Sequence, residues 1–258
     1  MKPLAELPRA GIRGLLFDID ETLTTEGKLT AEAYSAMERL RAAGRLVVPV
    51  TGRAAGLCDH IARMWPVDAV VGENGAFYFW FGDRKLQRRF QDGAEARASK
   101  RRRLESIARS ILAAVPGCAL ASDQHYRETD LAIDYCEDVP ALPLKTAERI
   151  ATLMRDAGLT ARISSIHVNG WFGDYDKLAM AQALLTERFG IDPVRARTEI
   201  AFAGDSPNDA PMFRFFEHSV GVANMRRFEA QLPDKPKFVT AAPSGAGFAE
   251  LVAHLLAR

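Results

Sequence analysis

The first seventy residues alternate between short apolar runs and amphipathic stretches, and this alternation limits the possible folds more than any other feature of the sequence. The apolar runs at 14–20 and 46–50 are predicted to be buried strands, and carboxylates end the first of them. Between the two runs, Thr30 can cap a helix and Gly44 can end it. A further helix and a third strand are expected at 58–65 and 69–71. Strand, helix, strand, helix, strand predicts a parallel sheet with crossover helices.

The pattern changes after residue 76 and resumes near Lys177. A hairpin at 77–90, with one aromatic face packing into the core of this inserted segment, begins the change. The inserted segment is expected to continue with a helix ending at 116–117, a strand at 131–135, a helix at 144–157 and a strand at 162–168. After Lys177, strands are expected at 200–203, 219–222 and 237–240. The fold class predicted is α/β, with a Rossmann-like parallel-sheet core formed by residues 1–76 and 171–258. An α+β domain is inserted at 77–170.

The charge balance gives no global argument for an anionic partner. Lys and Arg total 34 against 33 Asp and Glu, a net charge of +1. The basic run at 100–103 lies on a helix with a clean apolar face, so it is expected to be solvated rather than to bind nucleic acid. The N-terminus has no apolar run typical of a secretory signal, and no apolar stretch is long enough for a membrane span. Three scattered cysteines are expected to be reduced, which favours a cytoplasmic protein.

Four short polar segments lie at the carboxyl ends of predicted core strands or directly before a core helix. Open α/β sheets bind ligands at this edge. Asp18 and Asp20 end the first strand, and a spacing of two residues directs both side chains to the same side. Thr51, Gly52 and Arg53 end the second strand, where a hydroxyl and backbone amides can hold a phosphoryl oxygen.

The other two segments are Asp176-Lys177, before a helix, and Gly204-Asp205-Ser206-Pro207-Asn208-Asp209, after the strand at 200–203. A loop of clustered Asp and Asn side chains suits a hard cation, because Mg²⁺ prefers oxygen ligands. A lysine before a helix is a weaker signal when taken alone, since most lysines are solvated.

Together the four segments resemble the motifs of the haloacid dehalogenase superfamily of phosphotransferases. Asp-Ile-Asp-Glu-Thr at 18–22 matches the first motif D-x-D-x-T, Thr51 the second, Lys177 the third and the loop at 204–209 the fourth. The inserted domain and the segment Glu-Asn-Gly-Ala at 73–76 are similar to the type IIB cap subgroup, which includes sugar-phosphate phosphatases and phosphomannomutases. Glu21 is a departure, because many members have glycine there.

The resemblance implies roles for individual residues. Asp18 is the expected nucleophile, Asp20 the acid and then the base, and Lys177 and Thr51 the partners of the phosphoryl oxygens. The expected cofactor is Mg²⁺, held by Asp18, the main chain of Asp20 and Asp205. The expected metal site also includes Asp209, which orients the ion's surroundings together with Asn208.

Substrate contacts are expected from both domains. The residues expected to bind substrate are Thr51, Gly52, Arg53, Asn74, Arg162, His167 and Asn169. Arg162, His167 and Asn169 lie on the stretch that leads from the cap domain back to Lys177, where polar groups can face the crevice.

The function predicted is that of a Mg²⁺-dependent phosphatase for a small phosphate monoester such as a sugar phosphate, acting through an aspartyl-phosphate. A phosphomannomutase-like phosphomutase and a phosphometabolite-binding regulator without turnover stay open as alternatives. The partner expected is the small-molecule phosphate ester, with no nucleic acid and no membrane. The sequence does not predict an oligomeric state.

Overall fold

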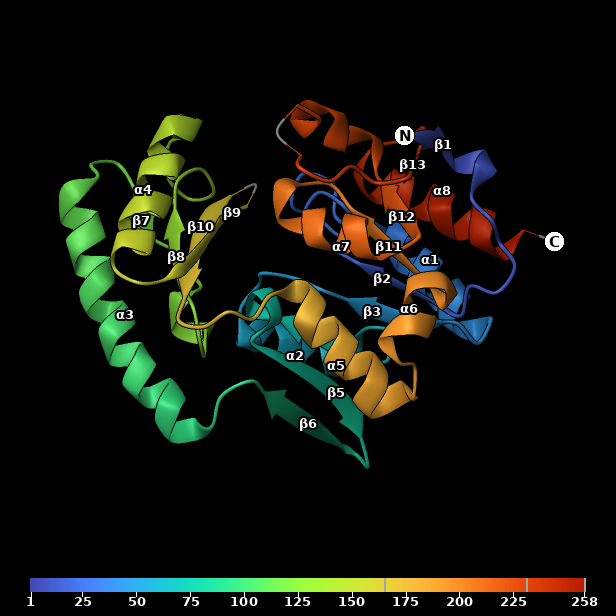
Figure 1. Ribbon diagram of the computed structural model, residues 1–258, viewed down its shortest axis with the longest axis horizontal. Helices are drawn as coiled ribbons and strands as arrows, with labels where there is room; N and C mark the ends of the chain where they lie inside the picture. The colour runs from blue at the N-terminus through green and yellow to red at the C-terminus, as the bar shows by residue number, and fades with distance from the viewer. Residues whose placement is uncertain (165, 231, 258) are drawn as a thin grey trace.

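The computed structural model describes residues 1–164, 166–230 and 232–257, which form two lobes (Figure 1). The larger lobe is built on a six-stranded parallel sheet in the order β1-β13-β12-β11-β2-β3. Its strands are β1 (Lys2–Pro3), β2 (Gly14–Phe17), β3 (Leu46–Pro49), β11 (Ile200–Gly204), β12 (His218–Gly221) and β13 (Phe238–Val239). The predicted fold class, an α/β core with a parallel sheet, is confirmed.

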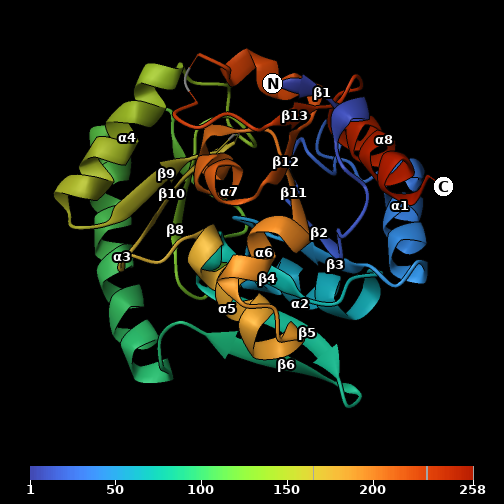
Figure 2. The same ribbon diagram turned by 45° about the vertical axis from the view of Figure 1, so that its right-hand side comes forward.

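Helices cover both faces of this sheet, so its strands are apolar along their whole length. Leu15 and Phe17 point to the face covered by α1 and α8, which lie side by side (Figure 2), whereas Leu16 points to the face covered by α5, α6 and α7. The core helices are α1 (Ala31–Ala42), α2 (Ala55–Met64), α5 (Lys177–Phe189), α6 (Pro193–Glu199), α7 (Ala210–Phe215) and α8 (Ser244–Leu256). The Thr30 side chain accepts from the Ala33 amide and caps α1, as predicted.

The smaller lobe is the cap, an antiparallel sheet in the order β7-β8-β10-β9 with α3 and α4 packed on one face. Its elements are α3 (Ala94–Ala114), β7 (Ala119–Leu120), β8 (Leu131–Asp134), α4 (Leu144–Asp156), β9 (Thr160–Ile163) and β10 (His167–Trp171). The expectation of one strand over 162–168 is wrong. Strand β9 pairs antiparallel with β10, so the chain reverses direction between Ile163 and His167.

A third sheet, β4-β5-β6, packs on the larger lobe, and the chain passes from β6 into the cap. It consists of β4 (Val70–Gly72), β5 (Phe77–Gly82) and β6 (Lys85–Phe90). The hairpin of β5 and β6 confirms the sequence pattern, and Asp83 and Arg84 form its turn with φ of 52° and 59°. However, Phe77 and Phe79 pack with Cys58 and other core residues rather than in the core of the cap, so that expectation is wrong. No helix among the described residues is long and apolar enough to cross a membrane.

Candidate active site

The site lies at the carboxyl edge of the core sheet, where β2 and β11 are neighbours. Phe17 pairs with Ala203, and the Asp18 amide donates to the Ala203 carbonyl at 3.0 Å. This register brings Asp18, which follows β2, next to Asp205, which follows β11. The two motifs are nearly two hundred residues apart in sequence and meet because parallel strands end at the same edge.

Three buried carboxylates and one lysine form the centre of the site. One oxygen each from Asp18, Asp205 and Asp209 lies within 4.8 Å of the others. The Lys177 Nζ lies 2.6 Å from Asp18 Oδ1 and 2.9 Å from Asp209 Oδ1. The Lys177 ammonium and the half-exposed Arg227 guanidinium, 3.4 Å from Asp205 Oδ2, face three carboxylates, so one negative charge is left for a divalent cation to neutralise.

The pKa values follow from this crowding. Burial raises the pKa of Asp18 to about 7, against the opposing effect of the Lys177 ammonium. Burial, with the charges of Asp18 and Asp209, also raises the pKa of Asp205 well above its usual value. Burial alone would lower the pKa of Lys177, but the two carboxylates that it contacts raise it above the usual range. The residues thus fit a Mg²⁺ ion, which prefers oxygen ligands and would favour the ionised forms.

Asp209 has both carboxylate oxygens in use. Its Oδ1 accepts from Lys177, and its Oδ2 accepts from the amides of Asp205 and Ser206 at 3.1 and 3.3 Å. The loop is tight, because a Cβ on Gly204 would lie 2.6 Å from Asp209 Oδ2. These contacts suit a role for Asp209 in positioning Lys177 and the loop. The neighbouring residue, Asn208, accepts a hydrogen bond from the Ser206 hydroxyl through its own Oδ1 at 2.5 Å.

Thr51 and Asn74 lie together on the other side of the site. The buried Thr51 Oγ1 accepts from the Arg53 amide at 3.0 Å, which leaves its own hydrogen to donate. The Asn74 amide donates to the Thr51 carbonyl at 3.1 Å, and the Asn74 Nδ2 is a buried donor with no partner among the described residues. A Cβ on Gly52 would lie 3.1 Å from the Asn74 Oδ1, so glycine leaves room for that side chain. A buried unpaired donor beside a candidate phosphoryl site is consistent with the expected substrate contact.

Arg53 connects the core to the cap. It donates to Asp20 through Nε at 3.1 Å and Nη2 at 2.8 Å, and through Nη1 to Glu137 of the cap at 3.1 Å. The other Glu137 oxygen lies 2.8 Å from His167 Nε2. Glu137 was not expected from the sequence. Asp134, at the end of β8, positions this loop by accepting from the Glu137 amide at 2.8 Å.

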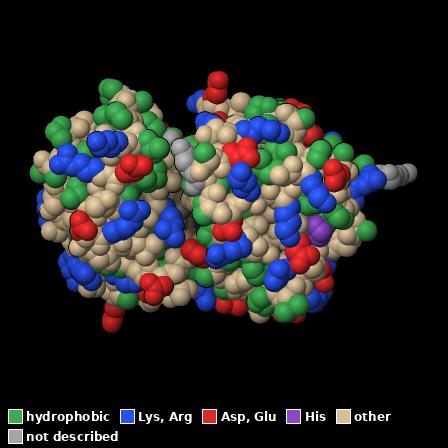
Figure 3. Space-filling view, turned by 45° about the horizontal axis from the view of Figure 1, so that its top comes forward, with side chains coloured by type: hydrophobic (Ala, Val, Ile, Leu, Met, Phe, Trp, Pro, Cys, Tyr) green, Lys and Arg blue, Asp and Glu red, His purple; other side chains and the backbone are tan. Residues whose placement is uncertain are grey.

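A cleft between the lobes contains most of the expected residues. Its lining consists of Asp18, Asp20, Gly52, Arg53, Arg127, Ser164, Ile166, His167, Asn169, Ser206 and Asn208. The surface is indented between the lobes in the space-filling view (Figure 3). His167 and Asn169 alternate along β10 and reach the cleft together, whereas Arg162 is exposed on β9 and does not line it.

A buried polar network also joins the two lobes beside this cleft. The Arg127 Nη1 donates to the Gly52 carbonyl at 2.9 Å and to Asp130 Oδ1 at 3.0 Å. The Asn169 Nδ2 donates to Asp130 Oδ2 at 3.0 Å. Arg127 is therefore fully engaged with protein groups, and the Glu73 carboxylate accepts backbone amides from both lobes nearby.

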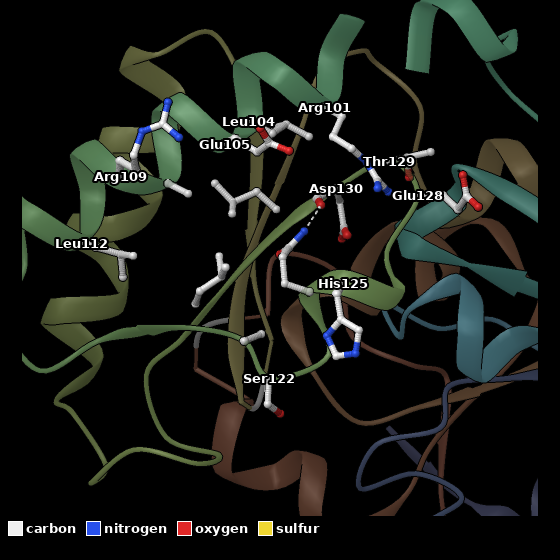
Figure 4. Close-up of a pocket in the computed structure, with 15 residues that line it drawn as sticks. Arg101, Leu104, Glu105, Arg109, Leu112, Ser122, His125, Glu128, Thr129 and Asp130 are labelled. Atoms are coloured by element: carbon white, nitrogen blue, oxygen red, sulfur yellow. Dashed lines mark hydrogen bonds between the residues drawn. The ribbon is translucent and has the colours of Figure 1, made fainter. Parts of the chain in front are cut away.

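A separate cavity lies within the cap, between α3 and the segment 120–131 (Figure 4). Arg101, Arg109 and His125 line it together with Leu104 and Leu112, among others. It shares no lining residue with the cleft, and the three carboxylates of the site are not part of it. The chemistry of the candidate site therefore lies in the cleft between the lobes.

The parallel core sheet, the inserted cap and the carboxylates at the strand ends define a known class of fold. The chain has the fold of the haloacid dehalogenase superfamily phosphatases, including those of subclass IIB, as the motifs predict. No family model and no curated protein matches the sequence, whereas many solved structures share the fold.

Three solved structures illustrate the similarity. A protein of Thermoplasma acidophilum, designated 0175, is 19% identical with a TM-score of 0.71, over 95% of this chain and 98% of that one. The sucrose-phosphatase of Synechocystis, in complex with sucrose and phosphate, is 17% identical with a TM-score of 0.65, over 95% and 98%. A sugar phosphatase of subclass IIB is 15% identical with a TM-score of 0.65, over 94% and 98%. At these identities the likeness concerns the fold.

Proposed function

We propose that the chain is a Mg²⁺-dependent phosphatase that hydrolyses a small phosphate monoester, in particular a sugar phosphate, through an aspartyl-phosphate on Asp18. The observation that carries the proposal is the contact of the Lys177 ammonium with Asp18 at 2.6 Å inside a cluster of three buried carboxylates. A sucrose-phosphatase and a sugar phosphatase have folds similar to that of this chain, which supports a sugar phosphate as the class of substrate.

Charge is the first obstacle to this reaction. A carboxylate and a phosphate oxygen at about 4 Å repel each other by roughly 4 kcal/mol per pair of unit charges at an effective dielectric of about 20. Lys177 offsets part of this repulsion and fixes one Asp18 oxygen, so that the other is free to face phosphorus. Thr51, whose Oγ1 accepts from the Arg53 amide and keeps its own hydrogen, would donate to a phosphoryl oxygen. A bound Mg²⁺ would neutralise further charge, with Asp18, Asp205 and the main-chain carbonyl of Asp20 as its ligands.

The proton transfers belong to Asp20. Asp18 attacks phosphorus while the bond to the leaving oxygen breaks, and Asp20 protonates that oxygen. Asp20 then takes a proton from the water that attacks the phosphorus and frees Asp18. The two-point contact from Arg53 orients the Asp20 carboxylate for both steps.

The test is phosphate release from a panel of phosphate esters with Mg²⁺, using wild type and Asp18→Asn. Hydrolysis of one or more esters by wild type and not by the variant supports the proposal. Phosphate that an acid quench traps on the wild-type chain, that hydroxylamine releases as expected for an acyl phosphate, and that is absent from the variant would identify Asp18 as the attacking group. Turnover of the panel by Asp18→Asn within about tenfold of the wild-type rate would refute it.

A further inference from the structure

The basic side chains that line the cleft are already paired with protein groups. Arg53 is bound to Asp20 and Glu137, and its side chain is only 20% exposed. Arg127, 1% exposed, is bound to Asp123 and to Asp130. Among the described lining residues of the cleft, no Lys or Arg is therefore free to pair with a second anion on the substrate.

A neighbouring pocket, which we call the mouth of the cleft because it shares Asp20, Arg53 and Ile166 with the cleft, is rich in carboxylates. Asp20, Glu21, Glu26 and Glu137 line it, against two arginines, Arg53 and Arg227. Counted by formal charge the four acids and two bases give a net charge of −2. The Arg227 guanidinium is half exposed, yet it lies 3.4 Å from Asp205 Oδ2 and stacks on the Phe228 ring at 4.7 Å.

Glu137 is the carboxylate best placed to act on the leaving group. It belongs to the cap and reaches across to Arg53, which holds the expected proton donor Asp20. Each of its oxygens has one partner in the protein, Arg53 for Oε1 and His167 for Oε2. A carboxylate has about four lone-pair positions, so each oxygen can accept one more hydrogen bond.

We propose that Glu137 makes this site select phosphate monoesters whose leaving group carries no second anionic group. The preferred leaving groups are neutral polyols and sugars with a protonated amine, and a second phosphate or a carboxylate is rejected. This inference rests on the proposed function and specifies the charge that the leaving group of the substrate can carry.

The physical reason is the imbalance of partners around the leaving group. Hydroxyls and ammonium groups can donate to Glu137, and the neutral side chain of Asn169, which uses one Nδ2 hydrogen on Asp130, offers further hydrogen bonds in the cleft. A second anion would face Glu137 in a partly buried space whose described arginines are each already paired with a carboxylate, and such like-charge contacts are strongly unfavourable. The hydrogen bond from Arg53 fixes Glu137, and His167 Nε2 lies 2.8 Å from its other oxygen, so Glu137 cannot turn away without breaking the bond to Arg53.

The experiment compares kcat/KM for three substrates that share one ring, glucose 6-phosphate, glucosamine 6-phosphate and glucose 1,6-bisphosphate, with 4-nitrophenyl phosphate as a general readout of hydrolysis. Wild type is expected to use the bisphosphate at least about tenfold less well than the two monophosphates. Glu137→Gln should reduce that gap to about threefold or less, whereas Glu137→Asp, which keeps the charge, should preserve most of it. Glu148→Gln, the same change on an exposed cap residue of α4, is the matched control and should leave the gap unchanged.

Salt separates a charge effect from a shape effect. Raising the ionic strength from about 0.02 M to about 0.5 M shortens the screening length severalfold. The ratio of kcat/KM between the monophosphates and the bisphosphate should therefore fall for wild type and stay the same for Glu137→Gln. A wild type that uses the bisphosphate as well as the monophosphates would overturn the inference. So would a preference for the bisphosphate that Arg227→Gln removes, because Arg227 would then be the partner of the second anion. Hydrolysis of no ester, including the aryl phosphate, would instead refute the proposed function and this inference with it.

Discussion

Glu73 offers the sharpest test of how the two lobes are held together. It is fully buried, and its carboxylate accepts amides from both sides of the junction. Oε1 accepts from Ala55 at 2.9 Å and from Glu128 at 2.8 Å, and Oε2 accepts from Thr129 at 2.7 Å and from Asp130 at 3.3 Å. Ala55 is the first residue of α2 in the core, whereas the other three belong to the cap segment. Glu73→Gln is therefore expected to weaken the junction as well as the fold.

The size of the effect follows from the donors. A glutamine side chain presents an NH₂ group in place of one oxygen, so in either orientation two buried amides lose their acceptor. Each unpaired buried donor costs about 1–3 kcal/mol, and removing a buried charge close to Asp130 recovers part of the sum. The net loss in the free energy of unfolding is expected to be about 2–4 kcal/mol. For a chain of this length that corresponds to a fall in Tm of roughly 5–15 °C.

The measurement is thermal unfolding at about pH 8, where Glu73 is ionised because burial raises its pKa only to about 7. Glu148→Gln on the exposed face of α4 is the control and should change stability by less than about 0.5 kcal/mol. The kcat/KM of Glu73→Gln, measured well below its Tm, should also fall, since the segment it holds carries Arg127 and its bond to Gly52. A Tm within about 2 °C of wild type would show that the amides find other partners and that the reasoning is wrong.

Asp18→Asn should remove turnover, and activity within about tenfold of wild type, or 1.4 kcal/mol of barrier, would contradict the assignment of the nucleophile. Lys177→Ala should lose both activity and about 3–5 kcal/mol of stability, because it leaves Asp18 buried without its cation, whereas Lys145→Ala on the exposed side of α4 should lose neither. Chelation by EDTA should stop turnover, and Mg²⁺ should restore it. High Ca²⁺ should inhibit, because Ca²⁺ prefers more ligands at longer distances. Full activity after exhaustive chelation would refute the assignment of Asp205 as a metal ligand. His167 and Arg53 hold the pKa of Glu137 at about 2, below its usual 4.5. The ionised Glu137 should therefore add about 1–2 kcal/mol to the free energy of unfolding above about pH 4.5, and this stabilisation should be lost as the pH falls toward 2. Denaturant titrations of wild type and Glu137→Gln should therefore differ at neutral pH and converge in acid, and a constant difference would contradict this.

The parts of the site that follow strand ends could be predicted from the sequence. Asp18 and Asp205 each come directly after a continuous apolar run, and a parallel sheet brings such positions to one edge. Lys177 begins α5 after Asp176, whose side chain caps the helix by accepting from the Ala179 amide at 2.8 Å. In each case the local pattern determines the element, and the element determines where the side chain lies.

Pairing between distant segments was harder to predict. The three apolar residues of β4 indicate a strand but not its partner, and most of its pairing is antiparallel with β5 rather than in the core sheet. Between Ile163 and His167 lie two serines but no glycine, proline or asparagine, so the turn signal for the reversal there was weak. The contacts of Glu137 and Glu73 depend on which cap loop meets which core loop. That relation is set by tertiary packing, and neither residue type nor spacing reveals it.

Glu21 shows how the structure can explain a departure that the sequence could only mark. Its φ is 57°, a left-handed conformation that glycine adopts without steric cost, which agrees with the glycine expected there in the motif that this segment resembles. In this chain the strained backbone is held by its neighbours, since Asn224 Nδ2 donates to the Glu21 carbonyl at 2.9 Å. The side chain accepts from the Gly27 amide at 3.3 Å and from the Ser244 hydroxyl at 3.4 Å. Glu21 thus connects the first motif to the start of α8 through hydrogen bonds. Its carboxylate also adds negative charge to the mouth of the cleft, where it would repel an anionic leaving group.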